Sequence, residues 1–167
     1  MAAGSTYTPI ATNTLSSAAS SVTFSSISGA YTDLVVVCNA GVTASGGYTL
    51  AMQLNGDTGN NYSGTRLSGN GTTAASYRAS NLNYYFAGLN MPDTLTTNVI
   101  FHLMNYSNTT TYKTALIRMN DVGVGTAAMA CLWRNTAAIT SINLSAEVGA
   151  TTLLAGSTFT LYGIAAA

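Results

Sequence analysis

The chain has 167 residues, of which 47% are hydrophobic and only 6% are charged, and its formal net charge is zero. A typical soluble domain is about 25% charged, so the polar surface of this one must consist mainly of Ser, Thr, Asn and Tyr. The five Lys and Arg residues are scattered and no apolar run is long enough for a transmembrane helix, so neither nucleic acid nor a membrane is an expected partner.

The length predicts a single domain over residues 21–167, preceded by an extended N-terminal arm over residues 1–20. The arm is rich in Ser, Thr, Ala and Asn, and Tyr7, Pro9 and Ile10 are its candidate interface residues. The first ten residues lack the basic segment and apolar core of an export signal, so we expect synthesis in the cytoplasm. Short uncharged side chains lose little entropy when they pack against a neighbour, which favours a protein built for an assembly.

The first half of the domain alternates with a period of two residues, which is typical of strands. The segment SVTFSSI places Val22 and Phe24 on one face. DLVVVCNA (33–40) is apolar on both faces, which predicts a central strand that is covered on both sides. YTLAMQL (48–54) alternates cleanly and predicts a further strand.

The middle of the chain is less regular. NGDTGNNYSG (55–64) is dense in turn residues and predicts a loop. Residues 65–90 predict at least one strand, around Tyr84 to Phe86, preceded by a long excursion. NVIFHLMNY (98–106) and YKTALIRM (112–119) are two strand patterns separated by SNTTT, so they predict a hairpin.

Three further strand patterns, AAMACLWR, AITSINL and STFTLYGI, bring the expected number of strands to nine or ten. Helical periodicity is almost absent. The predicted fold is therefore all-β, an antiparallel two-sheet β-sandwich of jelly-roll type. We expect the last strand to pair with early strands of the same chain and to bury Phe159 and Leu161, although pairing with another subunit is the alternative.

No arrangement of residues predicts catalysis. His102 is the only histidine, and we expect a partly buried or interface imidazole with one hydrogen bond. The five acids lie outside any motif, and no Gly-x-Ser-x-Gly sequence occurs. We therefore expect no enzyme activity, no catalytic or metal site and no cofactor. Cys38 and Cys131 are expected to be buried free thiols, with a disulfide between them as the alternative.

Two features suggest binding. The side chains of Asp57, Asn60 and Asn61 offer oxygen ligands for calcium, but the spacing of a calcium loop is missing and a turn closed by Asx side chains is favoured. The aromatic residues Tyr84 and Tyr85, with Phe86 and Trp133, are candidates for stacking on a sugar ring. Core packing is the favoured interpretation for Phe86 and Trp133, with the two tyrosines divided between core and interface.

Four segments together resemble a family of small virion proteins of tailed bacteriophages, described as structural, tail-fibre or decoration proteins. These segments are the opening YTPIATNTLSSAASSVTFSSISGAYTDLVVVCNA, the central LAMQLNGDTGNNYS, the late WRNTAAITSINL and the closing GSTFTLYGI. The resemblance implies a β-sandwich that assembles on the phage particle, commonly as a trimer. It carries over no catalytic residues.

The leading hypothesis is a capsid decoration (cement) protein, a homotrimer that binds the major capsid protein on the outer surface of the head. It predicts an apolar face rich in hydroxyl groups. The alternative is a tail-fibre or tailspike tip domain that binds host surface carbohydrate, which predicts an exposed aromatic patch near Tyr84, Tyr85 or Trp133. A secreted hydrolase is the third hypothesis, and the absence of converging acids disfavours it.

Overall fold

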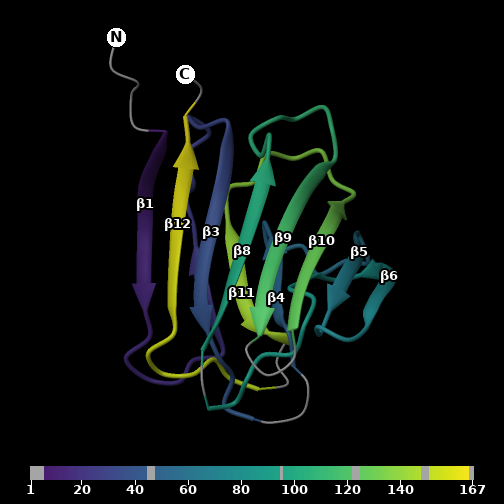
Figure 1. Ribbon diagram of the computed structural model, residues 1–167. Coiled ribbons are helices and arrows are strands. Elements are labelled where there is room, and N and C mark those ends of the chain that lie inside the picture. Colours follow the sequence, from purple (N-terminus) through teal and green to yellow (C-terminus); the bar gives the residue numbers. More distant parts are fainter. Residues whose placement is uncertain (1–5, 45–47, 95, 122–124, 148–150, 166–167) are drawn as a thin grey trace.

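The computed structural model describes residues 6–44, 48–94, 96–121, 125–147 and 151–165. They form two antiparallel sheets that pack face to face, with the larger sheet in front in Figure 1. The prediction of an all-β fold with two antiparallel sheets is confirmed. The described residues contain twelve strands, more than the nine or ten expected.

The larger sheet has eight strands. In spatial order they are β1 (Tyr7–Thr14), β12 (Thr158–Ile164), β3 (Asp33–Ala40), β8 (Thr97–Met104), β9 (Lys113–Asp121), β10 (Gly125–Trp133), β5 (Tyr62–Gly69) and β6 (Ala74–Leu82). The smaller sheet has four strands, in the order β2 (Ser21–Phe24), β11 (Ile142–Ala146), β4 (Leu50–Leu54) and β7 (Tyr85–Phe86). The chain crosses repeatedly from one sheet to the other, and β5–β6 and β9–β10 are hairpins added to the larger sheet.

Strict alternation in the sequence explains why most strands form where they do. In β9 the inward residues Ala115, Ile117 and Met119 are almost completely buried, while the residues between them are exposed. Each such strand places one apolar row against the smaller sheet, and this burial is the main favourable term for folding. The hairpin predicted for 98–106 and 112–119 is confirmed as the pair β8–β9.

An aromatic cluster fills the core between the sheets where β10 and β5 meet β7. Trp133 is fully buried, and its ring stacks on Tyr62 with the ring centroids 6.2 Å apart. Tyr85 contacts the same Tyr62 edge-on at 5.2 Å, and its hydroxyl donates a hydrogen bond to the carbonyl of Lys113. The expected packing of Trp133 in the core is confirmed.

The last strand is an interior strand of the larger sheet. β12 pairs with β1 on one side and β3 on the other, so the predicted pairing within the chain is confirmed. Phe159 and Leu161 are fully buried, as expected. Gly163 leaves room for the ring of Tyr31, because a Cβ atom at this position would lie 2.4 Å from that ring.

The predicted N-terminal arm contributes a strand to the domain. Residues 7–14 form β1 at the edge of the larger sheet, beside β12 (Figure 1). Residues 15 and 19 then make backbone hydrogen bonds to Ser157 and Leu153. The part of the arm over residues 1–5 lies outside the described residues.

Two local predictions were wrong. The strand expected around Tyr84 to Phe86 is confirmed as β7, but the residues before it do not form a long excursion, because they contain most of β5 and all of β6. β3 is an interior strand as predicted, but the described residues cover it with a second sheet on one side rather than on both. Its inner residues face the smaller sheet, whereas on the opposite face Val35 is buried and Val37 is half-buried.

Candidate interaction surface

The larger sheet has a second face, directed away from the smaller sheet, which we call the outer face. Antiparallel pairing defines it, because directly paired residues on neighbouring strands share a face. One row across the sheet is Pro9, Tyr162, Val35, His102, Leu116, Ala130, Thr65 and Arg78. The next row is Thr12, Thr160, Val37, Ile100, Arg118, Ala128, Leu67 and Ser76.

Apolar and hydroxyl side chains dominate these two rows. Leu67 is 62% exposed and Leu116 is 48% exposed, and both lie on the added strands β5 and β9. Between them runs a groove of about 550 Å³, lined by Thr65, Leu67, His102, Leu116, Ile117, Arg118, Ala128, Met129 and Ala130. A sheet face in contact with water normally carries charged residues, so this composition makes the outer face a candidate interaction surface.

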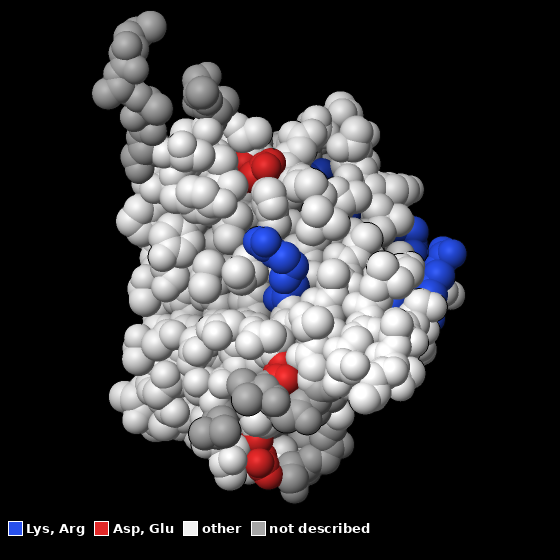
Figure 2. Space-filling model, in the orientation of Figure 1, with Lys and Arg blue, Asp and Glu red and all other residues white. Residues whose placement is uncertain are grey.

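Few charged groups interrupt the outer face. Figure 2 shows one blue patch near its middle, red atoms toward the top and bottom of the view, and further blue groups at the edge on the side of β5 and β6. Arg118 and Arg78 are the arginines in the two rows described above. A partner that covers this face would therefore desolvate few ions, whose burial is the costly part of forming an interface.

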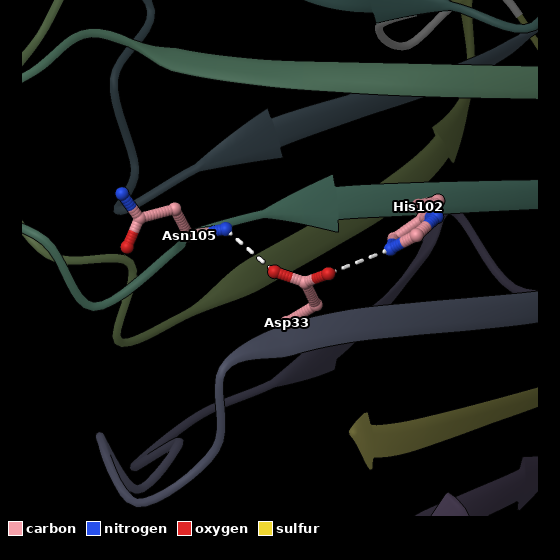
Figure 3. Close-up of polar contacts among 3 residues, drawn as sticks. All are labelled: Asp33, His102 and Asn105. Atoms are coloured by element: carbon pink, nitrogen blue, oxygen red, sulfur yellow. Dashed lines mark hydrogen bonds and ion pairs between the residues drawn. The ribbon is translucent and has the colours of Figure 1, made fainter. Parts of the chain in front are cut away.

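The side chains of His102 and Asp33 are within hydrogen-bonding distance of each other on the same face (Figure 3). Its Nε2 lies 3.0 Å from Oδ2 of Asp33, while Oδ1 of Asp33 accepts a hydrogen bond of 2.7 Å from the backbone amide of Asn105. The expected half-buried imidazole with a hydrogen bond is confirmed. Asp33 thus fastens the turn after β8 to the start of β3, which is a structural role.

Of the predicted arm residues, Tyr7 and Pro9 are exposed on β1. The ring of Tyr7 is 54% exposed and meets Tyr162 edge-on, with centroids 6.1 Å apart. Ile10 is half-buried at an irregularity in the β1–β12 pairing and packs against the core. Tyr7 and Pro9 therefore extend the outer face to the β1 edge, whereas Ile10 anchors the strand.

The two other predicted site residues differ in position. Tyr85 is 1% exposed, so it cannot belong to a binding surface in this fold, and that prediction was wrong. Tyr84 is half-buried at the surface, where its hydroxyl donates to Oε1 of Glu147 at 3.4 Å. Burial and the neighbouring carboxylate raise the pKa of Tyr84, so this hydroxyl keeps its proton and remains a donor.

In the loop after β4, the carboxylate of Asp57 accepts hydrogen bonds from donors of the same chain. Oδ1 of Asp57 accepts from the amide of Gly59 at 2.8 Å, and Oδ2 accepts from Asn61 at 2.9 Å and from the indole of Trp133 at 2.7 Å. Partial burial acts to raise the pKa of Asp57, but these hydrogen bonds outweigh it and the pKa is lowered. The turn favoured by the sequence is confirmed, and its carboxylate is already engaged.

Sequence reasoning missed Leu67, Leu116 and Ala128 as surface residues. The strand patterns contain a signal for two of them. Leu116 in ALIRM and Ala128 in AAMACLW occupy outward positions, where a strand that faces solvent would carry polar or charged residues. The predicted free cysteines are confirmed, since Cys38 and Cys131 are buried and unbridged.

Within the described residues, no three His, Cys, Asp or Glu side chains lie close enough together to hold a metal ion. The described part of the chain also has no helix that is long and apolar enough to cross a membrane. No model of a known protein family matches the chain, and no curated protein matches it.

Proposed function

We propose that this chain is a virion structural protein of a tailed bacteriophage, a capsid decoration protein that binds the outer surface of the head and stabilises the shell. The outer face is the observation that carries the proposal. It is an apolar face with many hydroxyl groups, as the decoration hypothesis requires, and the resemblance of four sequence segments to phage virion proteins points to the same class.

The physical basis of binding is burial of the outer face against the major capsid protein. A stable interface of ordinary size covers about 800 Å² on each partner, and the accessible surface of this chain is 8028 Å². Leu67 and Leu116 supply apolar contact area, while Thr65 and its hydroxyl-bearing neighbours supply short hydrogen bonds at small entropic cost. Symmetry of the shell, and a homotrimeric form of the protein, would multiply these modest contacts.

The jelly-roll topology belongs to the same proposal. The order β1-β12-β3-β8 in one sheet and β2-β11-β4-β7 in the other supports it, because this is the interleaving that two Greek keys produce. In this reading β9, β10, β5 and β6 are additions to the eight-stranded jelly roll, and they carry the groove. Viral capsid and lectin domains both use this architecture, so the fold alone does not choose the function.

Immunogold labelling of intact virions with antibody to this chain tests the proposal. Gold distributed over the head supports it, and gold confined to the tail overturns it in favour of a tail-fibre tip. Size-exclusion chromatography with light scattering gives a second readout. A trimer is expected, and a monomer at high concentration contradicts the homotrimer.

A binding assay then locates the contact. Purified protein is added to virions of a strain in which its gene is deleted, and bound protein is measured after sedimentation. We expect Leu116→Lys to weaken binding by about tenfold or more, because it places a charge in an apolar contact. The matched control is Tyr77→Lys, since Tyr77 is similarly exposed on the opposite face of the sheet. Equal binding of both variants would show that the outer face is not the contact.

A further inference from the structure

A second concave site lies on the other side of the β5–β6 hairpin. Arg66 and Tyr77 belong to the inner face of these strands, opposite to Leu67 and Arg78. The hairpin extends the larger sheet, and β7 is the end strand of the smaller sheet. An open cavity of about 220 Å³ lies between the hairpin and β7. The residues that matter in its lining are Arg66, Tyr77, Tyr84, Phe86, Asn90 and Glu147.

Aromatic rings form one wall of this cavity. Tyr77 is 50% exposed and meets Phe86 edge-on, with centroids 6.2 Å apart and an angle of 71° between the rings. The guanidinium carbon of Arg66 lies 5.5 Å from the centroid of Tyr77. Tyr84 adds a third aromatic side chain and a protonated hydroxyl. The wall therefore offers apolar ring faces whose positions are held by packing.

Hydrogen-bonding groups with spare capacity form the rest of the lining. Each oxygen of Glu147 has one long contact, with the Tyr84 hydroxyl and with the amide of Thr49, both at 3.4 Å. Arg66 donates from Nη1 to the carbonyl of Gly88, and its buried Nε has no partner within the described part of the chain. A carboxylate carries up to four acceptor sites and a guanidinium five donors, so both groups retain hydrogen-bonding capacity. In Arg66 the capacity available to a ligand lies on the terminal nitrogens, because Nε is buried.

The charges define what kind of ligand fits. Arg66 and Glu147 are of opposite sign, so the cavity favours neither an anion nor a cation. An ammonium ligand would be repelled by Arg66, and an apolar ligand would remove water from the acceptor sites of Glu147 that Tyr84 and Thr49 leave free. A ligand with one flat apolar face and several hydroxyl groups satisfies both walls. The volume is below the roughly 300–1,000 Å³ typical of drug-sized ligands, which limits it to a single small ring.

We propose that this cavity binds the ring of one neutral sugar, a pyranose stacked on Tyr77 with hydroxyl groups hydrogen-bonded to Glu147 and Arg66. The site is separate from the outer face, so the protein can bind a glycan whether or not it is mounted on a capsid. A sugar at the end of a longer glycan would project away through the open mouth of the cavity.

Saturation-transfer difference NMR on the purified full chain tests this proposal. The probes are the methyl glycosides of glucose, galactose and N-acetylglucosamine, with choline and acetate as the charged probes. We expect transfer to the ring protons of at least one glycoside and none to choline or acetate. Absence of transfer to all three glycosides, or transfer to choline or acetate alone, overturns the proposal.

Two variants assign the signal to the cavity. Tyr77→Ala removes the stacking surface and should abolish transfer, while Glu147→Gln keeps the shape and should weaken binding roughly tenfold, because a hydrogen bond to a charged group is lost. Tyr112→Ala removes a tyrosine that is 54% exposed elsewhere and should leave binding unchanged. Circular dichroism checks that each variant is folded. Undiminished transfer in both folded cavity variants places the sugar elsewhere and refutes the site. Leu116→Lys should bind sugar normally, so failure at the outer face and failure here are distinguishable.

Discussion

Replacement of Asp57 by Ala should destabilise the fold even though Asp57 lies on a surface loop. Its carboxylate accepts three hydrogen bonds, from the amide of Gly59, the side chain of Asn61 and the indole of Trp133. The first two donors are near the surface, and water can replace their partner. Trp133 is fully buried, so its N–H would be left without an acceptor.

The magnitude follows from this difference in exposure. A buried donor that loses its partner costs about 1–3 kcal/mol, and hydrogen bonds to charged acceptors lie toward the upper end of that range. The two solvated donors add little. We therefore expect Asp57→Ala to lower the free energy of unfolding by about 2–3 kcal/mol, which corresponds to a fall in Tm of roughly 4–12 °C for a chain of this size.

Urea denaturation followed by far-ultraviolet circular dichroism measures this change. The control is Asp93→Ala, because Asp93 is also half-buried but makes no hydrogen bond or ion pair within the described residues. A double-mutant cycle with Trp133→Phe isolates the bond, and we expect a coupling energy of about 1.5 kcal/mol. A coupling below about 0.5 kcal/mol, with Asp57→Ala no worse than Asp93→Ala, would refute the reasoning.

Four further predictions concern stability and reactivity. The pKa of Asp57 is lowered in the folded protein, so the stability that its carboxylate contributes is complete above the ordinary pKa of 3.8 and is lost as the pH falls through the lower folded-state pKa. The urea midpoint of the wild type should therefore drop more than that of Asp57→Ala between about pH 5 and pH 3. Phe159→Ala should cost about 3–5 kcal/mol, and an unchanged Tm would show that β12 is peripheral. Gly163→Ala should destabilise by about 1–3 kcal/mol, since its Cβ would meet the ring of Tyr31 at 2.4 Å, and an equally stable variant would mean that this ring moves freely. Burial raises the pKa of Cys131 to about 12, so its thiol should react with an aromatic disulfide reagent only after unfolding, and prompt reaction in the native protein would contradict the burial.

The strands that could be predicted from the sequence are those with one apolar and one polar face. In β9 and β12 the alternation locates both the strand and the residues that it buries, such as Ile117 and Leu161. The register between distant strands could not be predicted from the sequence. Nothing in the sequence near Pro9 specifies its position beside Tyr162, because pairing depends on the whole sheet rather than on local propensity.

The β5–β6 hairpin was missed for a physical reason. β6 is exposed along most of both faces, so its sequence AASYRASNL has no apolar row to reveal a period of two. Both candidate sites depend on this hairpin, since it carries Leu67 toward the groove and Arg66 and Tyr77 toward the cavity. The aromatic stretch around Tyr84 did predict the part of the chain that lines the cavity. Alternation alone could not predict whether Tyr84 or Tyr85 faces solvent.

The pairing of β1 with β12 has a consequence for how the protein is made. The hydroxyl groups of Thr12 and Thr160, 148 positions apart in the chain, lie 3.2 Å from each other across this pair. During synthesis β1 therefore lacks a partner strand, within the described part of the chain, until residues 158–164 have emerged, and β3 lacks one of its two neighbours for equally long. Sheets closed by such distant pairing fold slowly and expose unpaired edges in the meantime. A chain that lacks residues 158–164 would keep β1 and one edge of β3 open, which makes the addition of β12, rather than any local hairpin, the step that commits this fold.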